Sequence, residues 1–257
     1  MNPEQSKLAW PLVLDKYTLQ ARVVPAIIIA SPILPLAVVA LSVLNLSSKT
    51  IGSTAILFFA AIFAASQAVR VAGEAIEQKL WRSWGGAPST RFVRWRDAKF
   101  APETKERIHW IIRNRFGIAL LAFEAEAGDQ SLADSRIEQA FLQVRQVLRN
   151  EAAKDLVNTH NAEYGFVRNL VGTRSVFVVV AVGCVVASML GYYFHPGPRT
   201  LGLCGLETFL LALSIWFGWF VFPRLLQPAA DAYAESAWSS FLNLPSNMKY
   251  TKKPRSS

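Results

Sequence analysis

Four long apolar segments run along the chain, separated by two short polar turns and one long polar insert. A helix needs about 20 apolar residues to cross a bilayer, and each segment is close to that length. The pattern predicts an all-α membrane protein in which four transmembrane helices form two hairpins, with a helical cytoplasmic insert between them. The expected spans are Val23–Leu46, Thr54–Val71, Ser175–Phe194 and Leu201–Phe222.

These spans divide the chain into five parts. We expect a cytoplasmic N-terminal arm at 1–22, a first transmembrane hairpin at 23–71, a helical cytoplasmic domain at 72–174, a second transmembrane hairpin at 175–222, and a cytoplasmic C-terminal helix with a disordered tail at 223–257. No signal peptide is expected, because charged residues occupy the arm and the apolar run begins only after it.

The first span contains three prolines in its first half, Pro25, Pro32 and Pro35. A proline removes an amide donor and its ring clashes with the preceding helical turn, so the span should be bent or interrupted there. A packing kink and a hinge are both consistent with this spacing. The second span is expected to continue as a helix beyond the membrane.

The insert has the spacing of amphipathic helices, with apolar residues three and four positions apart. Glycine and proline mark its turns and the ends of its helices. The expected elements are a turn at Gly85–Pro88, helices over 101–123 and 132–159, a link at His160–Gly172, an end of the fourth span at Pro223, and a separate helix over Pro228–Asn243.

Composition and charge support a membrane protein and indicate its orientation. Hydrophobic residues make up 52% of the 257 residues and charged residues 18%, too apolar for an ordinary soluble chain of this size. Lys and Arg number 27 against 18 Asp and Glu, a net charge of +9. The two short turns hold one basic residue each, Lys49 and Arg199. The positive-inside rule then predicts a multi-pass protein of the bacterial inner membrane with both termini and the insert in the cytoplasm.

The sequence contains no combination of residues typical of catalysis or metal binding. The three histidines, His109, His160 and His195, are far apart, and none has a second ligand at the spacing of a metal site. Gly85-Gly86 lacks the further residues that would make a phosphate-binding loop. We therefore expect no catalytic site, no metal and no cofactor, and we do not expect an enzyme.

Glu207 is the acidic residue of the fourth span, where an ionised side chain is costly. Small and weakly polar residues, including Ser214, follow it on one helix face. Two interpretations remain open: a protonated carboxyl hydrogen-bonded to a neighbouring helix, or a ring of carboxyls that attracts cations into a pore between subunits. Gln67 and Arg70, at the inner end of the second span, are further candidates for a pore mouth.

The stretch Leu80–Asp97 (LWRSWGGAPSTRFVRWRD) interleaves tryptophan with arginine at the exit of the second span. Ten basic and three acidic residues lie within Lys79–Arg115. The stretch could anchor in the lipid interface, bind a nucleotide or short single-stranded nucleic acid by stacking and charge, or form internal core and ion pairs. The candidate ligand-binding residues are Lys79, Trp81, Arg82, Trp84, Arg91, Arg94, Trp95 and Arg96.

This stretch, followed downstream by Tyr-Gly-Phe-x-Arg-Asn at Tyr164–Asn169, resembles the transmembrane effectors of Hailong-type antiphage systems. The resemblance covers most of the chain and shares the four-span layout. It implies a channel gated from the cytoplasm and held shut by a nucleic-acid product of a partner nucleotidyltransferase. It transfers no site residue to this chain.

Two functions are therefore expected as alternatives. The first is an oligomeric inner-membrane channel, gated from the cytoplasm by an anionic nucleotide or nucleic-acid ligand, that depolarises the membrane as an antiphage effector. Four helices per chain enclose too little space for a wide pore, so a closed ring of identical subunits is expected. The second is a non-conducting membrane anchor or scaffold that recruits a cytoplasmic protein partner.

Overall fold

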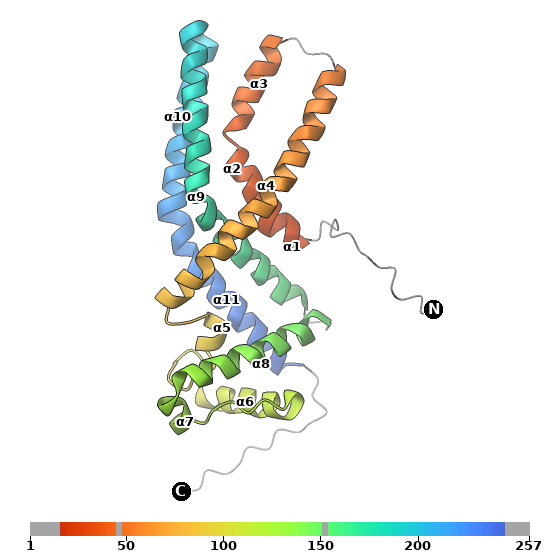
Figure 1. The fold of residues 1–257 in the computed structure, drawn as a ribbon, viewed down its shortest axis with the longest axis vertical. Helices are drawn as coiled ribbons and strands as arrows, with labels where there is room; N and C mark the ends of the chain where they lie inside the picture. The colour runs from red at the N-terminus through yellow and green to blue at the C-terminus, as the bar shows by residue number, and fades with distance from the viewer. Residues whose placement is uncertain (1–15, 45–47, 151–153, 245–257) are drawn as a thin grey trace, which may run out of the picture. The chain divides into compact units, whose positions relative to one another are not determined.

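Within residues 16–44, 48–150 and 154–244, which are the part of the chain that the computed structural model describes, every regular element is a helix (Figure 1). The predicted all-α class is confirmed. Most of the expected N-terminal arm, the centre of the first short turn (45–47) and the expected disordered tail lie outside the described residues.

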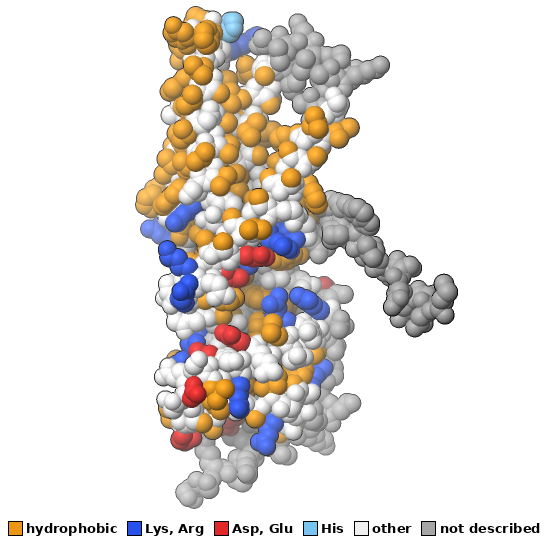
Figure 2. All heavy atoms as spheres, viewed as in Figure 1, with side chains coloured by type: hydrophobic (Ala, Val, Ile, Leu, Met, Phe, Trp, Pro, Cys, Tyr) orange, Lys and Arg blue, Asp and Glu red, His pale blue; other side chains and the backbone are white. Residues whose placement is uncertain are grey.

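The helices form two compact units, and α4, α9 and α11 contribute residues to both. Unit 1 comprises residues 1–75 and 162–225, and unit 2 comprises residues 76–161 and 226–257. Figure 2 shows hydrophobic side chains covering the visible face of the long helices of unit 1, whereas acidic and basic side chains are intermingled on unit 2. The apolar surface of unit 1 is therefore typical of a membrane-embedded part, and the charged surface of unit 2 is typical of a water-exposed part.

Unit 1 is built from long apolar helices. Three segments are long and apolar enough to cross a membrane: Ile56–Arg91, Asp155–Phe194 and Pro198–Leu242. As expected, the second span continues as a helix, because α4 has no break before Ser83. The elements that supply unit 1 are α1 (Lys16–Thr18), the π-helical turn η1 (Leu19–Val23), α2 (Val24–Ala30), α3 (Ile33–Leu44), α4 (Ser48–Ser83), α9 (Lys154–Phe194), α10 (Pro198–Trp216), the π-helical turn η2 (Phe217–Val221) and the start of α11 (Phe222–Leu242).

The first apolar segment is broken, as the prolines predict. The chain bends by 57° between Lys16–Ala30 and Ile33–Ala40, and it supplies a fourth candidate span if this bent pair crosses the membrane as one. Pro32 has no amide hydrogen to donate to the carbonyl of Ile28, four residues earlier. The Ser31 hydroxyl donates to that carbonyl instead, at 2.7 Å. The predicted bend is therefore confirmed.

The fourth apolar segment is longer than predicted. The expected end at Pro223 is wrong, because α10 passes through η2 into α11 and stops only at Leu242. In η2 the amide of Phe222 donates to the carbonyl of Phe217, five residues back instead of four. This wider turn lets the helix continue past Pro223. The helix expected to start at Pro228 is the second part of α11, with that proline inside it.

The segment His160–Gly172 is also helical, and its prediction as a link is wrong: it lies inside α9. Its polar and glycine residues are used for close helix contacts. A Cβ atom on Gly172 would lie 2.6 Å from the carbonyl oxygen of Ala72 in α4. Glycine therefore marks a close approach of two helices here, which in sequence looks the same as a break.

Unit 2 has its own hydrophobic core. Large side chains from α6, α8 and α11 fill it, among them Ile108, Val144 and Trp238, each fully buried. The helix predicted over 101–123 ends at Phe116, because Gly117 takes a left-handed conformation with φ 69°. The stretch predicted as a helix over 132–159 is helical as α8 up to Asn150 and again from Lys154, where α9 begins, and residues 151–153 lie outside the described residues. The remaining elements are α5 (Pro88–Arg91), α6 (Pro102–Phe116), α7 (Phe123–Gly128) and α8 (Gln130–Asn150).

Candidate functional site

The stretch Leu80–Asp97 lies entirely in unit 2 and turns sharply at its two glycines. Gly85 and Gly86 have φ of 77° and 126°, conformations that side-chain-bearing residues rarely adopt. The amide of Gly86 donates to the carbonyl of Trp81 at 2.7 Å, which ends α4. The predicted turn is confirmed, and it brings the two halves of the stretch back on each other.

Arg94 joins this turn to α8. Its guanidinium forms a two-pronged pair with Asp134, with Nε–Oδ1 and Nη2–Oδ2 distances of 2.6 and 2.7 Å. Its third nitrogen donates to the carbonyl of Gly85. The side chain is 8% exposed, so this charge is satisfied almost entirely inside the protein.

Arg91 joins the same turn to α11. It donates to the carbonyl of Trp84 at 3.1 Å, and it pairs with Asp231 at 3.2 Å and with Asp97 at 3.4 Å. Arg96 lies 3.6 Å from Glu126 and 3.8 Å from Asp134. The three arginines that follow the turn therefore have carboxylate partners within unit 2.

The tryptophans divide into two groups. The indole of Trp95 donates to the carbonyl of Leu121 at 2.9 Å, and its amide donates to Glu126 at 3.1 Å. Its ring lies 4.9 Å from that of His109. Trp81 and Trp84 are half-buried near the end of α4. Trp95 is thus a fixed part of the unit, with its polar atoms committed.

Lys79 and Arg82 differ from the arginines that follow the turn. Both are exposed on α4, and Arg82 donates only to the carbonyl of Gln78 at 3.3 Å. The eight candidate residues therefore do not form one open basic surface. The contacts of Arg91, Arg94 and Arg96 favour the structural interpretation of this stretch, because an anion binding there must displace carboxylates that already hold them.

Two further titratable groups beneath this network were not singled out from the sequence. Lys105 is 2% exposed, and its ammonium donates to the carbonyls of Trp95 and Asp97. Burial lowers the pKa of Lys105, while Asp97 and Glu126 act in the opposite direction. Burial also lowers the pKa of His109 to about 4, against a hydrogen bond with the Val93 backbone. Lys105 lies between Thr104 and Glu106 on α6, so the local sequence gives no signal for its burial.

Glu207 lies inside unit 1 with none of its surface exposed. Neither carboxylate oxygen has a hydrogen-bond partner among the residues that the structure describes. The residue lies on α10, and Cys184 of α9 is also buried within unit 1. Ser188 and Ser214 are also buried in these two helices. A buried carboxyl group without hydrogen-bond partners is costly in an apolar helix unless it is protonated or binds a cation.

The other pore candidates are engaged locally. Ser214 donates to the carbonyl of Leu211 at 2.8 Å, within α10. Gln67 donates to the hydroxyl of Ser66 at 3.4 Å, and Arg70 pairs with Glu74 at 3.6 Å, both within α4. Of the four candidates, Glu207 and Ser214 share full burial on α10, whereas Gln67 and Arg70 are half-exposed.

Among the described residues, no three His, Cys, Asp or Glu side chains are placed to hold a metal ion. Comparison with protein-family models, with curated proteins and with solved structures finds no match to this chain.

Proposed function

We propose that the protein is the subunit of an oligomeric membrane channel with Glu207 on its cation pathway. In this proposal the three candidate spans and the bent segment are four transmembrane helices in two hairpins. Both termini and unit 2 lie in the cytoplasm, as the distribution of basic residues suggests. Several copies form a closed ring, because four helices alone enclose too little space for a wide pore.

The environment of Glu207 carries the proposal. A carboxyl kept for structure is expected to hydrogen-bond to a neighbouring helix, since buried polar groups in proteins are almost always paired. Neither oxygen of Glu207 has such a partner in the described residues, although the side chain is fully buried. An unpaired ionisable residue in an apolar helix is typical of an ion pathway.

The described conformation corresponds in this proposal to a closed channel. Glu207 has no exposed surface, so ions reach it only after α10 moves relative to its neighbours. The proposed gate is an anionic ligand on the cytoplasmic side, a nucleotide or a short nucleic acid, whose loss or arrival opens the pore and depolarises the inner membrane. The resemblance of the sequence to Hailong-type effectors supports a role in antiphage defence with a nucleotidyltransferase partner.

Currents across planar bilayers that contain the purified protein test the role of Glu207. Glu207→Gln keeps the size of the side chain and removes the charge, so it should lower cation conductance or cation-over-anion selectivity at least severalfold. The matched control is Glu138→Gln, which removes an exposed carboxylate from α8 and should leave both unchanged. Equal currents and equal selectivity in the Glu207→Gln variant and the unmodified protein would reject the proposal.

A second candidate function is a non-conducting membrane anchor that recruits a protein partner through unit 2. The observation that favours it is the pairing of Arg91, Arg94 and Arg96 with internal carboxylates, since such a network stabilises a folded domain without creating a ligand site. A membrane-potential dye in cells separates the two functions. An anchor causes no depolarisation under any trigger, whereas an open channel does.

A further inference from the structure

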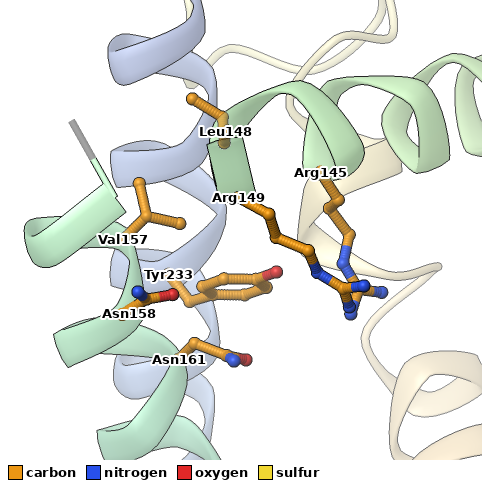
Figure 3. Close-up of a pocket in the computed structure, with 7 residues that line it drawn as sticks. All are labelled: Arg145, Leu148, Arg149, Val157, Asn158, Asn161 and Tyr233. Atoms are coloured by element: carbon orange, nitrogen blue, oxygen red, sulfur yellow. The ribbon is translucent and has the colours of Figure 1, made fainter. Parts of the chain in front are cut away.

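Unit 2 contains a hollow between α8, α9 and α11 (Figure 3). It is an open depression, and its empty space is about 350 Å³ when the open solvent at its mouth is counted. Leu148 and Val157 form an apolar base that is continuous with the hydrophobic core, and they are 2% and 8% exposed. The rest of the lining is polar. An apolar base with a few converging polar groups is the usual make-up of a small-molecule site.

Two arginines dominate the polar part of this hollow. Arg145 and Arg149 are one helical turn apart on α8, so they lie on the same face. Both line the hollow, and Figure 3 shows their guanidinium groups next to each other. Like charges at this spacing repel, so the arrangement is unfavourable until an anion joins them.

These arginines differ from Arg91, Arg94 and Arg96 in having no acidic partner among the described residues. Arg91, Arg94 and Arg96 each pair with a carboxylate. Arg145 and Arg149 have neither an ion pair nor a hydrogen bond to any residue in the described ranges. Among the described residues, nothing occupies their donors.

The neighbouring side chains supply further hydrogen-bond donors. The hydroxyl of Tyr233, from α11, points towards the two guanidinium groups in Figure 3, and Asn158 and Asn161 of α9 complete the lining. No lining residue is acidic. Two guanidinium forks, a hydroxyl and two amides suit an oxyanion with several oxygens and up to two negative charges. The phosphate group has these properties.

We infer that this hollow binds the phosphate group of a small phosphate ester, held chiefly by Arg145 and Arg149 and oriented by Tyr233. The site is separate from the Trp/Arg stretch and from Glu207. The test of this inference is independent of the proposed channel, because phosphate binding is measured on the purified protein and no current is recorded.

Calorimetric titration of inorganic phosphate into the full-length protein in detergent, at constant ionic strength, tests the site. The unmodified protein should bind phosphate, and the double variant Arg145→Gln with Arg149→Gln should bind at least tenfold more weakly. Tyr233→Phe keeps the ring and removes one donor, so it should weaken binding by less than the double variant. The matched control, Arg113→Gln with Arg115→Gln, removes the same charge from exposed positions of α6 and should bind as the unmodified protein does.

A thermal unfolding curve of each variant shows whether it is folded, and Arg149→Lys provides a milder change should the double variant unfold. The inference is wrong if the unmodified protein does not bind phosphate, or if the arginine variants bind it as tightly as the control does. The same titration in nanodiscs with and without an anionic phospholipid identifies the source of the phosphate. Competition by that lipid, lost in the arginine variants, indicates a lipid headgroup, and its absence indicates a soluble ester.

Discussion

The side-chain amide of Asn169 in α9 donates a hydrogen bond of 2.6 Å to the carbonyl oxygen of Ala21 in η1. In a regular α-helix that carbonyl would accept from residue 25, but residue 25 is a proline and has no amide hydrogen. Asn169 thus supplies the donor that Pro25 lacks. It is 1% exposed, and it ties α9 to the broken first segment within unit 1.

Asn169→Ala should leave the carbonyl of Ala21 unpaired inside unit 1, at a cost of about 1–3 kcal/mol. The melting temperature in detergent should fall accordingly. Pro25→Ala restores a backbone donor, so Asn169→Ala should cost less in that background. Asn114→Ala, which removes an exposed amide bonded to its own helix at 2.8 Å, is the control and should have little effect. Equal losses with and without Pro25 would contradict this account.

Gly73→Ala should destabilise unit 1, because the added Cβ would lie 1.9 Å from Oδ1 of Asn169. We expect a loss of about 1–3 kcal/mol, typical of overpacking. Shortening Asn169 to Ala in the same chain should recover part of it. Gly183→Ala, where no atom lies within 4 Å of the new Cβ, should be close to neutral in the same thermal assay. A neutral Gly73→Ala would show that the two helices are not in close contact.

Gly86→Ala should cost more than Gly85→Ala. Both residues have positive φ, so either substitution strains the backbone by roughly 1–2 kcal/mol. At Gly86 the new Cβ would also lie 2.5 Å from Nη2 of Arg94, whereas at Gly85 it meets no atom within 4 Å. The difference between the two melting temperatures contains the displacement of Arg94 and the greater backbone strain at φ 126°. It should become smaller in an Arg94→Ala background.

A double-mutant cycle of Arg94→Ala and Asp134→Ala should give a large coupling free energy. The arginine side chain is 8% exposed, and removing either partner leaves a charge without its pair, at a cost on the order of 3 kcal/mol. The exposed Arg70–Glu74 pair, with side chains 40% and 49% exposed, should couple by no more than about 0.5 kcal/mol. Similar coupling in the two cycles would mean that burial does not distinguish them.

His109 should make unit 2 less stable in mild acid. Its pKa is about 4 in the folded protein and about 6.5 when unfolded, so the unfolded chain takes up the proton first. Stability is complete above pH 6.5, falls as the pH drops towards 4, and loses roughly 3 kcal/mol over that window. The difference in melting temperature between the unmodified protein and His109→Phe should change across it. His195→Phe, at an exposed position, is the control variant.

The helical class, the candidate spans and the bend follow from local pattern, because bilayer length and proline chemistry act over one segment at a time. The end of α6 at Phe116 and the continuity through Pro223 do not, since the left-handed conformation of Gly117 and a π-helical turn decide them. The partners of Arg91 and Arg94 could not be predicted. Asp231 and Asp134 are 140 and 40 residues away, and no periodicity connects positions so distant. The sequence therefore shows the basic cluster but not its neutralisation.

The two π-helical turns stand in the same relation to a proline: η1 ends two residues before Pro25, and η2 ends two residues before Pro223. A π-helical turn holds one residue more than an α-helical turn, so every side chain beyond it is rotated by about 100° around the helix axis. The faces of α2 and α11 are thus set by one inserted residue each. Deleting a single residue from Phe217–Val221 would leave the span apolar and of nearly the same length. It would nevertheless rotate the side chains that follow the deletion by about 100° relative to those of α10.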